Sequence, residues 1–201
     1  MDTTSKPNKV SAQSFAFLTA CAMLAIATLV VASSSHQVEQ LDSLVVPRTG
    51  HAATALSDGR VLITGGHDNT GNLVAVSEIF DPETQISTAS ATLTTARVDH
   101  TATRLADGRV LVVGGTGDSG SLSSAEIFDP AHPENGFTTV GSAMSAARTR
   151  HTATLLNSGS VLIAGGEATG TAEMFDPATQ TFSPTLWPLT VARSGHTATL
   201  F

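Results

Sequence analysis

Four histidines recur along the chain at nearly equal intervals, and histidine is the most common metal ligand among protein side chains. They are His51, His100, His151 and His196, with intervals of 49, 51 and 45 residues. If they converged in the fold, they could hold a zinc ion, which takes three or four protein ligands. The alternative is that each histidine hydrogen-bonds to the backbone at a repeated position of the fold. We expect this structural role, with no metal and no other cofactor.

Charged residues recur with the same period as the histidines. An arginine lies three residues before each histidine, and a glutamate lies two residues before each phenylalanine of three Phe-Asp-Pro phrases. Arginine and carboxylate side chains form strong, directional ion pairs. Because these residues are identical in every unit, we predict that they stabilise the repeated fold. The set is Arg48, Arg97, Arg148, Arg193, Glu78, Glu126 and Glu173.

Residues that differ between the units are better candidates for ligand binding. Each unit contains a glycine pair, and the polar loop that follows the pair diverges most. Binding residues are typically carried by loops on a rigid scaffold, so we predict that these loops bind a protein or a glycan. The alternative is that they are ordinary turns, which are rich in the same residue types. The glycines are Gly65, Gly66, Gly114, Gly115, Gly165 and Gly166, and the candidate loop residues are His67, Asp68, Asn69, Asp118, Ser119 and Glu167.

Composition and missing motifs exclude several functions. The net charge is −7, and the only lysines are Lys6 and Lys9, so nothing resembles a phosphate-binding basic stripe and nucleic acid is not an expected partner. The one cysteine, Cys21, allows no intrachain disulfide. No Gly-x-Ser-x-Gly elbow, His-Glu-x-x-His pair or Walker loop is present. We therefore predict a non-catalytic protein.

The N-terminal segment predicts export. Phe15 to Ala32 is an uncharged, largely apolar run of 18 residues that follows the two lysines. A basic leader before an apolar stretch is typical of a signal peptide, and the length also approaches that of a membrane span. We interpret residues 1–36 as a hydrophobic helix that is a signal peptide or an N-terminal membrane anchor. If it is not cleaved, it is the only part of the chain that we expect to contact a membrane. Both alternatives place the remainder outside the cytoplasm.

Elements that position these residues are short strands separated by turns. In each unit a strand rich in threonine and alanine is followed by a tight turn, such as Asp58-Gly59, and then by a wholly apolar strand that ends at the glycine pair. A third strand ends at Asp-Pro, where proline cannot donate to a sheet. A weaker fourth strand follows. Four strands repeated about every 50 residues predict an all-β propeller made of four-stranded blades.

The repeated residues resemble the kelch family of propellers. The resemblance rests on the glycine pair, the aromatic-Asp of the third strand and the Arg-x-x-His that opens each unit, and it extends from Arg48 to Phe201. Phenylalanine stands where kelch units usually have tyrosine, and the usual fourth-strand tryptophan is replaced by Ile86, Phe137 or Phe182. The implied organisation is a linker or partial strand at 37–47, blades at 48–96, 97–147 and 148–192, and the first strand of an incomplete fourth blade at 193–201.

The resemblance also bounds the function. It is closest to exported bacterial kelch arrays, whose relatives include the propeller of galactose oxidase. Copper radical chemistry of that enzyme needs tyrosines and a cysteine, and this sequence has no tyrosine. We expect a binding module. The alternatives are a sugar-acting enzyme completed by other blades and a fragment of a larger kelch protein. A homo-oligomer that completes the ring is a further expectation.

Overall fold

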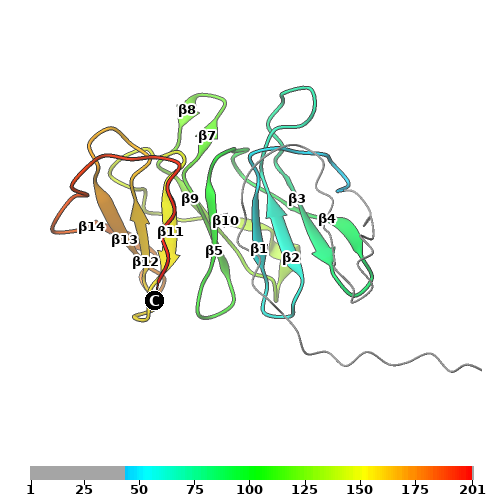
Figure 1. Cartoon of the computed structure of the whole chain (residues 1–201). Helices are drawn as coiled ribbons and strands as arrows, with labels where there is room; N and C mark the ends of the chain where they lie inside the picture. The colour runs from blue at the N-terminus through cyan, green and yellow to red at the C-terminus, as the bar shows by residue number, and fades with distance from the viewer. Residues whose placement is uncertain (1–43, 201) are drawn as a thin grey trace, which may run out of the picture.

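Three four-stranded antiparallel sheets follow one another in the computed structural model, which describes residues 44–200 (Figure 1). The first blade contains β1 (Ala52–Ala55), β2 (Val61–Thr64), β3 (Val76–Asp81) and β4 (Ile86–Thr92). The second contains β5 (Thr101–Arg104), β6 (Val110–Val113), β9 (Ala125–Phe128) and β10 (Phe137–Thr139). The third contains β11 (Thr152–Leu155), β12 (Val161–Ala164), β13 (Ala172–Asp176) and β14 (Thr181–Pro184). The predicted all-β class and the four-stranded units are confirmed.

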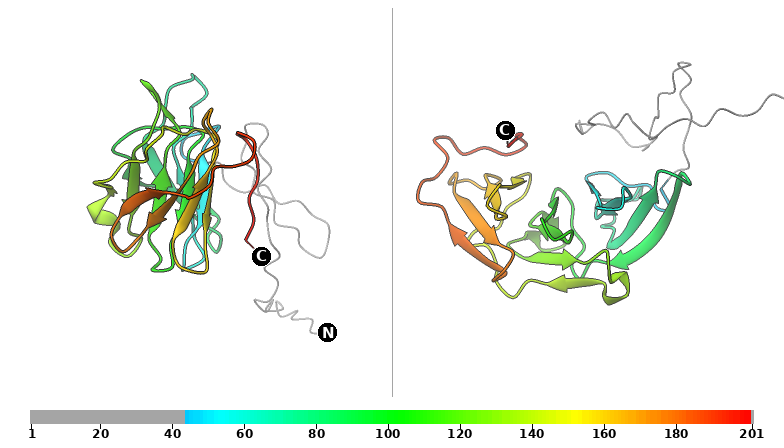
Figure 2. Two further views of the ribbon diagram at one scale, coloured as in Figure 1. Left: turned by 90° about the vertical axis from the view of Figure 1, so that its left-hand side faces the viewer. Right: turned by 90° about the horizontal axis from the view of Figure 1, so that it is seen from below.

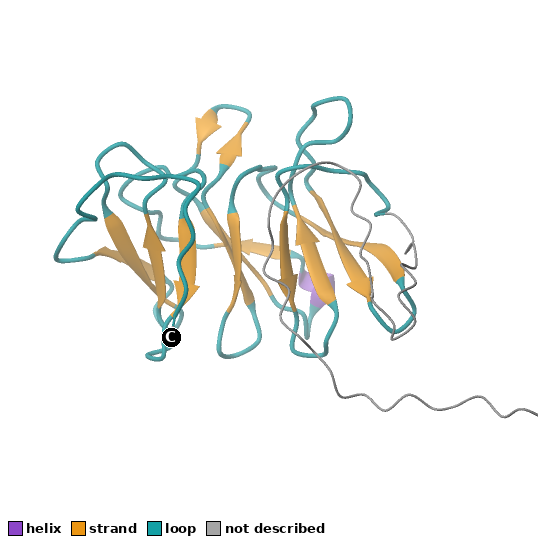
Figure 3. Ribbon diagram, in the orientation of Figure 1, coloured by secondary structure: helices purple, strands orange, loops and turns teal. Residues whose placement is uncertain are grey.

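Two small elements lie outside this repeat (Figure 3). A hairpin of β7 (Thr116–Gly117) and β8 (Gly120–Ser121) extends the loop after the second glycine pair. A short 3-10 helix, η1 (Pro133–Asn135), precedes β10. No helix within residues 44–200 has the length and apolar character of a membrane span. The predicted signal peptide or anchor lies outside the described residues.

The blades pack face to face through branched and aromatic side chains. Leu62 and Ile79 of the first blade contact Val110, Val112 and Phe128 of the second, and all five are at most 8% exposed. Burying one such side chain contributes about 1.5–3 kcal/mol. The equivalent residues at the next junction are Leu111, Ile127, Val161, Ile163 and Phe175.

Phenylalanines that replace the usual kelch aromatics keep a packing role. Phe128 stacks on Phe137 with ring centroids 5.0 Å apart, and Phe175 lies 4.9 Å from Phe182 in the next blade. Such pairs contribute about 0.5–1.5 kcal/mol beyond the burial of their area. In the first blade the structure corrects the sequence-based placement of Ile86, because Ser87 lies opposite Phe80 while Ile86 lies opposite Asp81 and is 49% exposed.

The glycine pairs lie at the end of the second strand, where the second glycine faces backbone of its own unit and the first faces backbone of the next unit. Gly115 has φ +90°, and a Cβ at this residue would lie 2.6 Å from the carbonyl oxygen of Val98. Gly114 has φ +60°, and its Cβ would lie 2.6 Å from the carbonyl oxygen of Arg148. Both the backbone conformation and the close approach therefore require glycine here.

The three blades form an open arc, with the first strand of each blade on its inner side (Figure 2). β5 contacts both β1 and β11, so neighbouring blades meet along these inner strands. The structure differs from the sequence-based expectation at residues 193–200, which form no strand. An inner strand is hydrogen-bonded to the second strand of its own blade, as β1 is to β2. The described residues include no second strand for a fourth blade.

Candidate functional site

Motif arginines form buried ion pairs inside each blade. The guanidinium of Arg97 lies 2.7 Å from Glu126, and that of Arg148 lies 2.9 Å from Glu173. Arg48 pairs with Glu78 in the same way. All three arginine side chains are 0% exposed and also donate to backbone carbonyl groups. Arg97, for example, donates to the carbonyl oxygen of Gly114 at 2.9 Å. They are satisfied internally and leave no charge for a ligand.

The backbone carbonyls of Arg97, Arg148 and Arg193 each accept a hydrogen bond from the preceding blade. The carbonyl of Arg97 accepts a 2.9 Å hydrogen bond from the Gly66 N–H of the first blade. The carbonyls of Arg148 and Arg193 accept from Gly115 and Gly166, each at 2.8 Å. The side chain therefore organises one blade while the backbone fixes the neighbour.

His100, His151 and His196 each meet a threonine hydroxyl of the preceding blade, not the backbone that the sequence suggested. The ring Nε2 of His100 lies 2.8 Å from Thr64 Oγ1, and that of His151 lies 2.9 Å from Thr101 Oγ1. Burial lowers the pKa of His100 to about 3 and that of His151 to about 4, with nearby arginine as a further cause. The rings are therefore neutral near pH 7 and act as junction residues.

The threonine partner changes strand between blades. Thr101 lies on the inner strand β5, but its counterpart in the first blade is Ala52. There the hydroxyl comes from Thr64 on β2, which is the direct cross-strand partner of Ala52. In the second blade, the partner of Thr101 is Val113. A single hydroxyl at either of two facing positions is thus enough to meet the next histidine.

Residues directly before the histidines form a hydrogen-bonded row, here called the inner belt. It consists of Gly50, Asp99, Arg150 and Gly195, all with positive φ between 54° and 68°. The N–H of Asp99 donates to the carbonyl of Gly50 at 3.0 Å, and Arg150 donates to Asp99 at 3.0 Å. Gly195 continues the row by donating to Arg150 at 2.7 Å. The belt crosses both blade junctions and reaches the C-terminal segment.

Asp99 and Arg150 are unusual members of this belt. The other two positions carry glycine, which adopts positive φ without strain. A left-handed conformation costs a residue with a side chain about 1–2 kcal/mol. Both side chains are partly or largely exposed, at 31% and 66%, and they form a cross-blade ion pair of 2.9 Å. Strained residues of this kind concentrate at functional sites.

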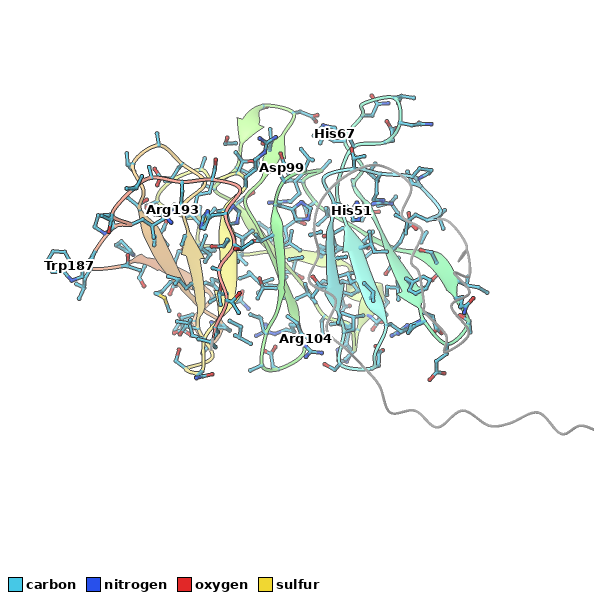
Figure 4. All side chains as sticks on the ribbon, in the orientation of Figure 1. His51, His67, Asp99, Arg104, Trp187 and Arg193 are labelled. Atoms are coloured by element: carbon cyan, nitrogen blue, oxygen red, sulfur yellow. The ribbon has the colours of Figure 1, made fainter. Side chains whose placement is uncertain are left out.

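A cleft of about 530 Å³ lies beside this pair. Asp99 and Arg193, which line it, lie on the face that carries the β7–β8 hairpin (Figures 1 and 4). We call this cleft the upper cleft. Thr116 and Thr149 share a 3.0 Å hydrogen bond on its wall, and none of its lining residues is aromatic. It is lined by Asp99, Thr116, Thr149, Arg150, Gly166, Glu167, Ala168, Ala192, Arg193 and Ser194.

Among the loop residues singled out from the sequence, His67 lies on the same face (Figure 4), and Asp118 and Ser119 lie in the β7–β8 hairpin, but only Glu167 lines the upper cleft. The Asp68 carboxylate accepts hydrogen bonds from Thr70 and Asn72 of its own loop, and these bonds lower its pKa. The Glu167 carboxylate likewise accepts from Thr169 and Thr171. These two acids shape their own turns.

The remaining loop candidates lie further from the upper cleft. His67 is held by backbone hydrogen bonds to Thr49 in both directions, while Asn69 is exposed. Asp118 and Ser119 are exposed at the tip of the β7–β8 hairpin. Within residues 44–200, no group of three or more acidic, histidine or cysteine side chains could hold a metal ion.

Comparisons with known proteins identify the fold and nothing finer. No family model matches the sequence, and no curated protein does. The structure is similar to that of YjhT, a kelch-repeat β-propeller protein, with a TM-score of 0.63 and 17% sequence identity. The described part of the present chain therefore has the fold of a kelch propeller. The match covers 77% of this chain and 56% of YjhT, so this propeller spans little more than half of that relative.

Proposed function

We propose that this kelch propeller is a non-catalytic exported module that binds a protein or glycan ligand in the upper cleft. The observation that carries the proposal is the pair Asp99 and Arg150. Charged residues occupy two belt positions where glycine would be unstrained, and both residues line the upper cleft. A strained, exposed pair contributes little to stability, so binding is the better account of its presence.

Hydrogen-bonding groups in the cleft suit a polar ligand. Arg150 uses its Nε on Asp99, and its two Nη groups have no hydrogen-bond partner within residues 44–200. Hydroxyls of Thr116 and Thr149 and the backbone of Gly166 add donors and acceptors. Protein segments and glycans both present the carboxylate, amide and hydroxyl groups that such a lining can bind.

Binding is favoured over catalysis because the acidic side chains around the cleft already form ion pairs or hydrogen bonds with other residues of the chain. Asp99 is paired with Arg150, and Glu167 holds its own loop. His100, His151 and His196 each pair with a threonine hydroxyl, and within residues 44–200 no carboxylate is hydrogen-bonded to these three rings. No nucleophile with a general base beside it is present among the cleft residues. Export is supported by the apolar run Phe15 to Ala32 after the two lysines.

A peptide array and a glycan array probed with two proteins test this proposal. The wild type should bind a defined subset of probes, and the double variant Asp99→Gly/Arg150→Gly should lose that binding. Glycine restores the residue found at the other belt positions, so the fold should persist. Arg104→Ala, a charge removal on the lower face (Figure 4), should bind like the wild type. An unchanged profile in the double variant would place the ligand elsewhere, and no binding by the wild type would reject a binding function.

A further inference from the structure

The outer face of the third blade is an unpartnered blade junction. Its apolar residues are Leu156, Leu162, Met174 and Leu189, and all four are partly exposed. The equivalent residues of the other two blades are at most 8% exposed, because each set is covered by the next blade. Those covered sets are Leu56, Leu62, Ile79 and Leu93 in the first blade and Leu105, Leu111, Ile127 and Met144 in the second.

Beside this face, several repeated polar contacts lack their usual partner. The hydroxyl of Thr54 donates to the Ala102 carbonyl at 2.9 Å, and that of Thr103 reaches the Ala153 carbonyl at 3.4 Å. Thr154 makes no equivalent bond within residues 44–200. Arg193 is exposed, and its only side-chain hydrogen bond among those residues joins Nε to the carbonyl of Val191. Apolar and polar features therefore indicate the same missing occupant.

The established junctions define what that occupant must look like. Each one seats a blade whose second strand presents two branched apolar side chains and whose third strand presents phenylalanine and a glutamate paired with arginine. The first blade of this chain has this composition, with Val61, Ile63 and Phe80 on the side away from the second blade. Among the described residues these three cluster only with Leu44, and no blade lies on that side.

We propose that this face binds the first blade of a second copy of the chain, and that two such contacts close a six-bladed ring. In this contact, residues 48–55 of the second copy displace residues 193–200. Both segments begin with the same Arg-x-Gly-His motif. The incoming blade already contains its Arg48–Glu78 pair, whereas Arg193 has no carboxylate partner among the described residues. Two copies related by one two-fold axis form two identical contacts, and six blades lie within the usual range for propellers.

This arrangement also completes the wall of the upper cleft. Residues 192–194 line the cleft now, and the equivalent residues of the first blade are 47–49. Thr49 is hydrogen-bonded in both directions to His67, which begins the loop that contains Asp68. A docked second copy would therefore place this loop beside Arg150. The polar loop of the first blade would gain a role in the binding site that it lacks in one copy.

The oligomeric state of the purified protein tests the docking without any ligand, so it can fail independently of the proposed function. Native mass spectrometry of the wild type should give a discrete dimer, at twice the mass that the same sample shows when denatured. Leu162→Arg and Val61→Arg each place a charge at both contacts and should weaken dimerisation at least about tenfold, which corresponds to 1.4 kcal/mol. Mixing these two variants leaves one contact free of either substitution and should partly restore the dimer.

Two controls keep the result interpretable. Ile86→Arg adds the same charge at an exposed position on neither face and should remain dimeric. Met174→Arg provides a second disruption of the same face if Leu162→Arg does not fold, as judged by circular dichroism. A monomeric wild type, an open polymer, or a dimer that survives both face variants would overturn the proposal.

Discussion

Removing the hydroxyl that meets His100 should destabilise the first junction, and restoring it from the facing strand should repair the damage. Thr64→Val leaves the His100 ring without a partner, because its Nδ1 already has none within residues 44–200. A buried polar group that loses its partner costs about 1–3 kcal/mol. For a protein of this size, each kcal/mol lowers the melting temperature by about 2–4 °C.

The second blade shows how to reverse this loss. There the threonine stands on the inner strand and a valine faces it, as in Thr101 and Val113. Ala52→Thr/Thr64→Val reproduces that arrangement in the first blade, and it should recover most of the lost stability. Chemical denaturation of the wild type, both single variants and the double variant gives the coupling energy. If the double variant is no more stable than Thr64→Val alone, the exchange of hydroxyls between strands is not what satisfies the histidine.

Three further predictions concern stability. Glu126→Ala leaves the buried Arg97 charge without its partner and should lower the free energy of unfolding, measured with urea, by about 3–5 kcal/mol. A decrease below about 1 kcal/mol would contradict a buried ion pair. Gly115→Val should lower the melting temperature strongly because its Cβ would lie 2.6 Å from a carbonyl oxygen, while Gly141→Ala, with open space, should not. The pKa of His100 is about 3 in the folded protein and 6.5 in the unfolded chain. Its contribution to the free energy of unfolding should therefore be complete above pH 6.5 and decrease as the pH falls towards 3. A His100→Asn variant should flatten this profile, and an equal slope would refute the assignment.

The blade architecture follows from the sequence because it depends on local signals. Asp-Gly turns, a wholly apolar second strand and a proline after the third strand each specify one element, and their repetition identifies the blade. The need for glycine at Gly115 also follows from its place at a strand end. In the structure, the backbone carbonyl of Val98 also lies close to this glycine.

The candidate site could not be predicted in the same way, because it depends on contacts between blades. Asp99 and Arg150 precede the motif histidines, and their positive φ arises from the cross-blade belt. The available signal was that the same position is glycine in the first and fourth units. The loops after the glycine pairs diverge more in sequence, yet Asp68 holds its own turn. Sequence variation alone did not separate turn residues from cleft residues.

The partner of the histidines was also outside the reach of the sequence. A backbone contact and a threonine contact are equally compatible with the motif, since the choice depends on strand register between blades. Likewise, residues 193–200 repeat a strand motif but form no strand, because a strand needs a hydrogen-bonded neighbour. Both differences come from tertiary neighbours that local patterns do not specify.

Ligand binding at the upper cleft can be located directly through the signals of the arginine side chains. The chain has eight arginines, so their Nε–Hε signals form a simple nuclear magnetic resonance spectrum. On titration with the tightest probe from the arrays, the signal of Arg150 should shift most, and that of Arg104 on the lower face should not move (Figure 4). A shift at Arg104 with Arg150 unchanged would contradict the account.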